Sequence, residues 1–140
     1  MAQNTSHAVM AQRHESAESL DDFPTPPWAT RTFLENVLGG RASIGNMTCL
    51  EPACNRGFMV KPLREYFSTV GASDIFDYGF GDVADFLSAE HEPDSFDWVI
   101  TNPPFKAAEQ FAIEGLKVAR VGVALLVRTV FIESVGRYQR

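Results

Sequence analysis

The residues best suited to chemistry in this sequence form a tetrad, Asn102-Pro103-Pro104-Phe105, directly after the apolar segment 96–101. The side-chain oxygen of Asn102 and the carbonyl oxygen of Pro103 can each accept a hydrogen bond from one N–H of an amine. The prolines restrict the backbone and hold that carbonyl in place, and the ring of Phe105 can stack on a planar target. The tetrad therefore suits an exocyclic aromatic amine. A plain proline turn capped by Asn102, with Phe105 in the core, fits the same pattern.

A second candidate site lies in the turn after the apolar segment 47–51, with the sequence Glu51-Pro52-Ala53-Cys54-Asn55-Arg56-Gly57. A ligand reaches the backbone of such a turn only where side chains leave room or where φ can be positive. Gly57 lacks a Cβ, and Asn55 is the best non-glycine residue for the left-handed conformation. The pattern is typical of a ligand-binding loop and also of a tight strand-to-helix turn that binds nothing.

Acidic residues follow at the ends of the next two expected strands. Asp74 lies near the end of segment 70–75, where an acid in a nucleotide-binding sheet accepts hydrogen bonds from ribose hydroxyls. Asp85 and Phe86 lie at the end of segment 82–87, where the carboxylate can accept from an adenine amino group while the ring covers the base. One such acid alone is typical of a solvated loop. With Glu51 at the end of the first expected strand, however, there are three acids at successive strand ends, and this pattern predicts a nucleotide-like ligand.

Strands and helices alternate along the chain in a way that would position these residues. Short apolar segments predict strands at 47–51, 70–75, 82–87, 96–101 and 121–130, and helical spacing predicts helices at 25–38, 58–68 and 106–119. This alternation predicts an α/β fold with a doubly wound, mainly parallel, Rossmann-like sheet. The almost continuously apolar run 121–130 is typical of a central strand covered on both faces. Ligands of this fold class bind beyond the carboxyl ends of the strands, where the candidate residues fall.

Length and composition limit the classes of protein that fit. The chain has 140 residues, of which 45% are hydrophobic, and a formal net charge of -6. We expect residues 1–20, which are polar and aperiodic, to form a disordered arm and residues 21–140 to form one domain. The net charge argues against binding nucleic acid by bulk basicity. Since no apolar run approaches the ~20 residues of a membrane span, we expect no membrane association and a cytoplasmic location.

Metal binding is not expected from the cysteines and histidines. Cys49 and Cys54 lack the spacing of a redox or zinc pair. The three histidines, His7, His14 and His91, have no second ligand three or four residues away. We therefore predict reduced thiols, solvated histidines and no metal site.

The tetrad and the turn together resemble class I S-adenosylmethionine-dependent methyltransferases that methylate amines. The resemblance is to N6-adenine DNA methyltransferases of the phage or prophage type in particular. The family's catalytic tetrad matches Asn102 to Phe105, and its cofactor motif matches Glu51-Pro52-Ala53-Cys54 with Gly57. The segment Pro24-Thr25-Pro26-Pro27 is similar to the N-terminal motif that helps to hold the methionine end of the cofactor. The family usually has glycine where this chain has Asn55.

This resemblance implies that S-adenosylmethionine is the cofactor and that its methyl group is transferred to N6 of adenine in DNA. It implies catalytic roles for Asn102, Pro103, Pro104 and Phe105. The residues expected to bind the cofactor are Pro24, Thr25, Pro26, Glu51, Pro52, Ala53, Cys54, Asn55, Gly57, Asp74, Asp85, Phe86 and Asn102. Because a base inside a duplex cannot reach such a site, the mechanism also implies base flipping.

Two alternatives to a DNA methyltransferase stay open. The same tetrad serves enzymes that methylate base amines in RNA or glutamine side chains in proteins, and a negatively charged chain without a visible basic patch keeps both substrates open. The family's sheet normally adds an antiparallel pair after the last strand predicted here, so we expect a domain whose final strands are missing. A truncated cofactor-binding module without independent activity is therefore the third interpretation.

Overall fold

A computed structural model describes residues 24–127 of the chain. The strands are β1 (Thr48–Glu51), β2 (Thr69–Asp74), β3 (Asp82–Val83), β4 (Phe96–Thr101) and β5 (Ala119–Leu125). The helices are α2 (Pro27–Asn36), α3 (Gly40–Ile44), α4 (Val60–Tyr66), the short 3-10 helix η1 (Phe105–Ala107) and α5 (Ala108–Val118).

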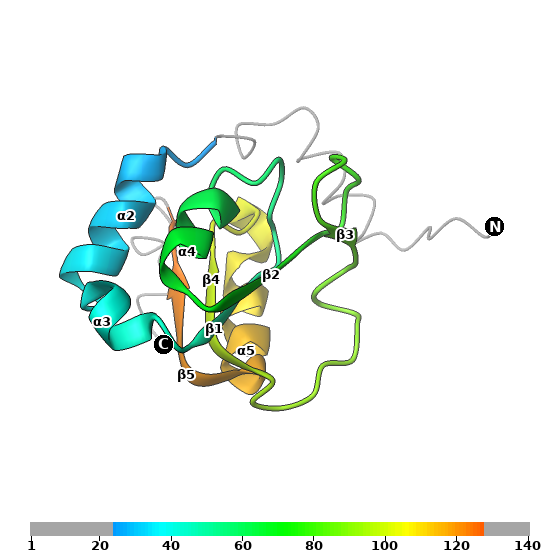
Figure 1. Ribbon diagram of the computed structural model, residues 1–140. Helices are drawn as coiled ribbons and strands as arrows, with labels where there is room; N and C mark the ends of the chain where they lie inside the picture. The colour runs from blue at the N-terminus through cyan, green and yellow to red at the C-terminus, as the bar shows by residue number, and fades with distance from the viewer. Residues whose placement is uncertain (1–23, 128–140) are drawn as a thin grey trace, which may run out of the picture.

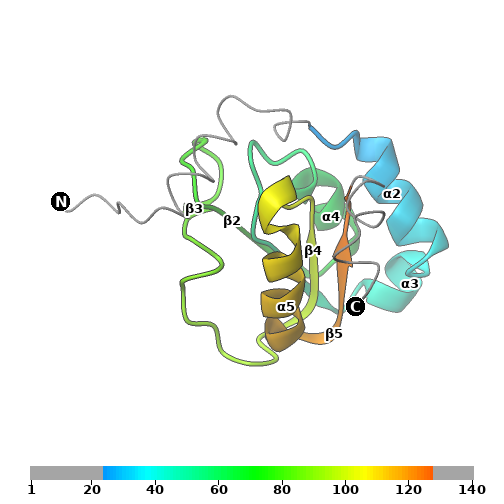
Figure 2. The same cartoon turned by 180° about the vertical axis from the view of Figure 1, so that it is seen from behind.

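The five strands form one sheet in the order β3-β2-β1-β4-β5, and every neighbouring pair is parallel. Helices α2, α3 and α4 cover one face of this sheet, and α5 covers the other (Figure 1; Figure 2). The predicted doubly wound parallel sheet is therefore confirmed. The strand order reverses between β1 and β4, and the loops that follow these two strands lie at the same end of the sheet (Figure 1).

Two apolar clusters hold the layers together. Leu34 of α2 and Leu63 of α4 pack with Ile100 of β4 on one face, and all three are almost fully buried. On the other face Phe111 of α5 packs with Val99 of β4. Since neighbouring residues of β4 serve opposite faces, this strand lies at the centre of both clusters.

The last described strand differs from its prediction. We expected a central strand at 121–130, but β5 starts at Ala119, ends at Leu125, and pairs only with β4 among the described residues. Val121 is 51% exposed. The apolar run predicted the strand correctly and its neighbours wrongly, because composition reports β propensity and not what covers each face. Residues 128–130 of the predicted strand, and the predicted arm at 1–20, lie outside the described residues.

Two further local differences have backbone causes. Helix α2 stops at Asn36, and after Gly39, which has a φ of 86°, the chain forms the unpredicted helix α3. Segment 82–87 contributes only a two-residue strand, because Asp85 accepts hydrogen bonds from the amide of Leu87 and the hydroxyl of Ser88 and so holds a turn. Short polar side chains that bond to nearby backbone groups commonly end strands in this way.

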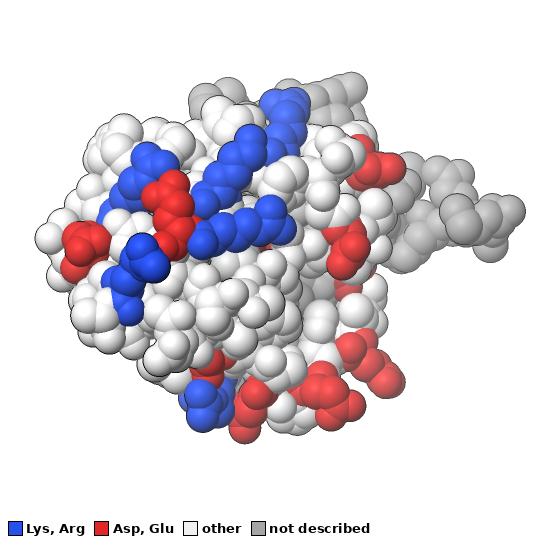
Figure 3. Space-filling view, in the orientation of Figure 1, with Lys and Arg blue, Asp and Glu red and all other residues white. Residues whose placement is uncertain are grey.

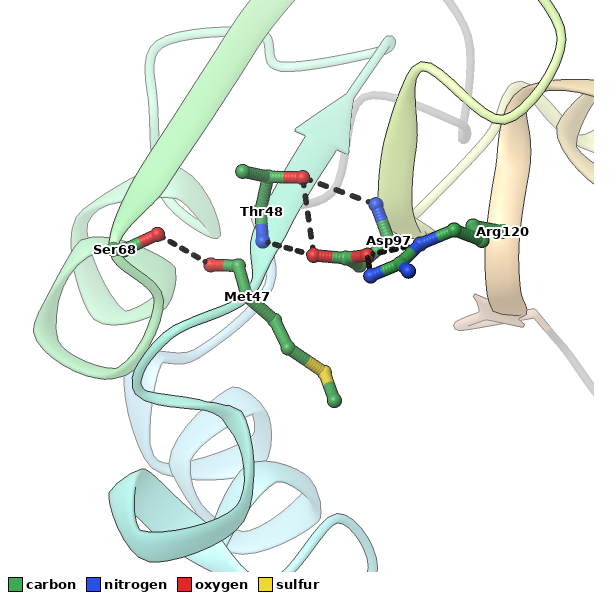
Figure 4. Close-up of polar contacts among 5 residues, drawn as sticks. All are labelled: Met47, Thr48, Ser68, Asp97 and Arg120. Carbon is green, nitrogen blue, oxygen red and sulfur yellow. Dashed lines mark hydrogen bonds and ion pairs between the residues drawn. The ribbon is translucent and has the colours of Figure 1, made fainter.

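A polar cluster ties three strands together at the amino ends, opposite the end described below (Figure 4). The Asp97 carboxylate accepts hydrogen bonds from the backbone N–H of Thr48, at 2.9 Å, and from the guanidinium of Arg120. The Thr48 hydroxyl in turn accepts from the Asp97 backbone N–H at 3.0 Å. These contacts, led by the Thr48 amide and then the Arg120 guanidinium, lower the pKa of Asp97. They fix the register of β1, β4 and β5.

Candidate functional site

The loop after β1 has the backbone conformation that its sequence predicts. Asn55 has a φ of 51° and Gly57 a φ of 88°. The Asn55 side-chain oxygen accepts from the next backbone N–H, that of Arg56, at 2.7 Å. A Cβ on Gly57 would lie 2.4 Å from the ring of Phe80. The left-handed asparagine is therefore the conformational equivalent of a glycine, and Gly57 cannot be replaced without moving Phe80.

Glu51, the last residue of β1, is buried under this loop and is 1% exposed. Its Oε1 accepts hydrogen bonds from the Ala53 backbone N–H, at 2.9 Å, and from the Thr101 hydroxyl at the end of β4. Burial raises the pKa of Glu51 to about 8, with a further rise from the charge of Asp74, while the two hydrogen bonds oppose the shift. Glu51 thus joins the carboxyl ends of the two central strands, as a carboxyl that is largely protonated at neutral pH.

Asp74, at the end of β2, holds the same loop from the other side. One carboxylate oxygen accepts from the Asn55 backbone N–H and the other from that of Phe76, both at 2.9 Å. The Cys54 backbone N–H donates to the carbonyl oxygen of Ser73, also in β2, at 2.9 Å. The loop is therefore anchored to β2 by backbone and side-chain contacts together.

The tetrad begins where β4 ends. Asn102 is half-buried, Pro103 is buried, and Phe105 starts η1, which leads into α5. The Asn102 side-chain nitrogen donates a hydrogen bond to the hydroxyl of Thr25 at 3.1 Å. Thr25 is 5% exposed and lies just before α2. The N-terminal proline motif and the tetrad are therefore in direct contact.

One small cavity that opens to solvent lies between these segments. Its lining residues are Pro24, Thr25, Glu51, Ala53, Cys54, Asn55, Phe58, Met59 and Asn102. Seven of these nine were predicted as site residues. Burial, with the nearby carboxyls of Glu51 and Asp74, raises the pKa of the Cys54 thiol to about 12, so this thiol remains protonated.

The sequence did not predict Phe58 and Met59 as site residues, because their spacing also fits the buried face of the helix expected at 58–68. They are the two residues between Gly57 and Val60, where α4 starts. The available signal was their position in the turn rather than their apolar character. They give the cavity an apolar wall opposite its polar residues.

The other predicted cofactor residues lie near this cavity or away from it, but do not line it. Pro26, Pro52 and Gly57 are sequence neighbours of residues that line it, whereas Asp74 contacts the loop from β2. Phe86 is 2% exposed, with its ring 5.2 Å from that of Phe111 and 4.9 Å from that of His91. The expectation that Phe86 covers an adenine ring is therefore wrong for this structure, because the ring fills the core under α5. Asp85 holds its own turn.

No group of three His, Cys, Asp or Glu side chains within residues 24–127 could hold a metal ion. In the same residues no helix has the length and apolar character needed to cross a membrane. Both cysteines are free thiols.

No protein-family model matches the chain, and neither does any curated protein sequence. Solved structures do match. A chain from Anaeromyxobacter dehalogenans, assigned as a type II methyltransferase, is 23% identical with a TM-score of 0.55; the match covers 75% of this chain and 48% of that one. The 23S rRNA methyltransferase ErmE is 17% identical with a TM-score of 0.60, over 84% of this chain and 53% of ErmE.

A third match is phosphoethanolamine N-methyltransferase 1 from Haemonchus contortus, solved with phosphoethanolamine and S-adenosylhomocysteine. It is 13% identical with a TM-score of 0.58, and the match covers 84% of this chain and 31% of that protein. The fold of the chain is therefore that of the class I methyltransferases. The chain spans about half the length of the first two of these structures and about a third of the last.

Proposed function

We propose that this chain forms the cofactor- and amine-binding part of an S-adenosylmethionine-dependent methyltransferase that acts on the N6 amine of adenine in DNA. The observation that carries the proposal is the contact between Asn102 and Thr25 across a cavity whose floor is Glu51 and whose rim is the left-handed loop at Asn55. The alternative, a plain proline turn that binds nothing, gives no reason for the segments that contain Thr25 and Asn102 to meet beside a cavity.

The tetrad supplies two acceptors for the target amine. Because the Asn102 amide nitrogen bonds to Thr25, its amide oxygen is directed away from that residue. This oxygen and the Pro103 carbonyl oxygen accept one N–H each from the amine. Both hydrogen bonds draw the nitrogen towards sp³ geometry and localise the lone pair that would otherwise be delocalised into the ring. No strong general base is needed, since the methylated nitrogen is acidic enough to lose its proton to water.

The cavity residues fit S-adenosylmethionine by their chemistry. When bound, this cofactor supplies an electrophilic methyl group on a sulfonium. The positive φ of Asn55 and the missing Cβ of Gly57 let a ligand lie against the backbone of the loop, and Phe58 and Met59 give it an apolar wall. Asp74, 8% exposed at the end of β2, would accept from ribose hydroxyls in addition to the backbone N–H groups of Asn55 and Phe76. Pro24, Thr25 and Pro26 would bound the methionine end.

Adenine in DNA is the substrate that the resemblance of the tetrad and the cofactor motif favours. The target base has to leave the duplex before its amine can reach Asn102, which requires a flipped nucleotide. Half-buried Phe105, at the start of η1, would stack on the flipped base. RNA is the second candidate, supported by the structural similarity to the rRNA methyltransferase ErmE.

Transfer of tritium from labelled S-adenosylmethionine to duplex DNA, RNA and protein extract, assayed in parallel, tests the proposal. We expect label in DNA at N6 of adenine, and none in protein. Asn102→Ala should abolish transfer and leave calorimetric cofactor binding largely intact, because Asn102 is one of nine residues that line the cavity. Asn46→Ala, at an exposed asparagine before β1, is the matched control and should transfer normally. Label in RNA alone would overturn the DNA assignment, and cofactor binding without transfer to any substrate would overturn the proposed activity.

A further inference from the structure

The described cations are distributed unevenly. The whole chain carries a formal net charge of -6, yet Lys and Arg side chains gather over α2 and α4 on the face shown in Figure 3, while Asp and Glu gather towards its lower right. Arg56 lies in the loop after β1, and Lys61 and Arg64 lie on α4; all three are exposed. Uncharged residues separate them in the sequence, so they form no continuous basic run.

Aromatic rings order the two arginines of this group. The guanidinium carbon of Arg56 lies 5.7 Å from the ring centre of Tyr78, and that of Arg64 lies 5.5 Å from the ring centre of Phe80. Lys61 and Arg64 are three residues apart and so project from the same side of α4. A cation over the face of a ring keeps its charge, so the guanidinium of Arg64 can still attract an anion.

Ion pairing separates Lys61 and Arg64 from other cations of the described residues. Within residues 24–127, neither Lys61 nor Arg64 forms an ion pair, whereas Arg31 pairs with Glu65 and Arg120 with Asp97. The group also begins at the cavity, because Arg56 directly follows Asn55, which lines it. A nucleic-acid strand that passes this edge of the cavity can therefore continue along α4.

We propose that Arg56, Lys61 and Arg64, here called the cationic strip, bind backbone phosphates of the nucleic acid whose base reaches the tetrad at Asn102. This inference rests on the proposed function, because the tetrad beside the cofactor cavity is taken as the base-binding site. Phosphate contacts of this kind set the position of the nucleic acid and carry no sequence information. They would also let a chain of net negative charge bind a polyanion. Salt screens charges that lie more than ~8 Å from the bound strand, so the nearby cations matter more than the net charge of the whole chain.

Two double variants that remove equal charge test the strip. Lys61→Gln/Arg64→Gln removes two strip cations, and Arg41→Gln/Lys117→Gln removes two exposed cations elsewhere, on α3 and α5. Binding of a fluorescently labelled DNA duplex and single strand is measured by anisotropy at several salt concentrations, with S-adenosylhomocysteine present. We expect the strip variant to bind about tenfold more weakly and to have a salt slope lower by about 1–2, with the control unchanged.

Equal loss of DNA affinity in both variants would show that overall charge and not the strip binds DNA. Unchanged DNA affinity in the strip variant would also overturn the proposal. Polyglutamate as competitor separates nucleic acid from an acidic protein, and displacement of DNA at equal charge concentration would count against nucleic acid. The outcome is distinguishable from the proposed function: strip-dependent DNA binding without tritium transfer contradicts only the activity. Normal transfer with strip-independent binding contradicts only the strip.

Discussion

The side-chain amide of Asn102 donates a hydrogen bond to the hydroxyl of Thr25 at 3.1 Å, across 77 residues of sequence. The proline segment 24–27, which resembles a cofactor motif, and the tetrad 102–105 therefore lie in direct contact and line the same cavity. This bond fixes the orientation of the Asn102 side-chain amide. Under the proposed function, Thr25 is therefore a positioning residue as well as part of the cavity wall.

Thr25→Val tests this relationship, because valine keeps the shape of threonine and removes its hydroxyl. We expect methyl transfer to fall by about 10²-fold in kcat, since a misoriented amide no longer accepts from the amine. Cofactor affinity should change much less, because the wall of the cavity is preserved. Thr25→Ser should restore most of the lost rate. Equal losses of kcat and affinity in Thr25→Val would assign the residue to cofactor binding alone.

Asn55 provides a test of the loop conformation that needs no substrate. Its φ of 51° is accessible to asparagine and glycine at little cost, whereas an alanine there pays about 1–2 kcal/mol. We therefore expect Asn55→Ala to lower the free energy of unfolding by about that amount in urea titrations. Asn55→Gly should stay close to the parent protein. Identical stabilities of the two variants would contradict the left-handed conformation.

Glu51 should make stability depend on pH in the direction opposite to a salt-bridged acid. Its folded pKa, about 8, is above the ordinary value of 4.5, so between these values the folded chain binds a proton that the unfolded chain has lost. The contribution of Glu51 to stability is therefore constant below pH 4.5 and falls as pH rises towards 8, by an amount on the order of a few kcal/mol.

Glu51→Gln keeps an oxygen acceptor for Ala53 and Thr101 and removes the ionisation. The variant should gain stability relative to the parent as pH rises from 5 to 8, measured by urea unfolding at each pH. A constant difference between the two proteins across that range would show that the buried carboxyl does not titrate there.

Asp97 should act in the opposite sense at the other end of the sheet. Its pKa is lowered below the usual 3.8, first by the Thr48 amide and then by Arg120, so its contribution is present above that value and lost as pH falls through the lowered pKa. Asp97→Asn should cost about 2 kcal/mol at pH 7 in urea unfolding. The deficit should shrink in acid, where the parent carboxyl is itself protonated. A deficit of the same size at low pH would mean that charge is not the cause.

The parts of the site that the sequence predicted are those governed by local chemistry. The left-handed Asn55, the glycine at 57 and the acids at the ends of β1 and β2 follow from rules about turns and parallel sheets. The contact between Thr25 and Asn102 could not be derived in this way, because it depends on where α2 packs. The place of Phe86 was wrong for a related reason: one aromatic ring suits a ligand or a core equally, and only its neighbours decide.

The Asp97 cluster has a consequence for how the two ends of the sheet are held together. It stabilises β1, β4 and β5 from their amino ends, while the cavity and tetrad occupy the loops at their carboxyl ends. A substitution in the loops on the cavity side leaves the Asp97 contacts in place, so the alignment of the three strands does not depend on those loops alone. Each end of the sheet thus has its own buried or half-buried carboxyl that joins neighbouring strands, Asp97 at one end and Glu51 at the other.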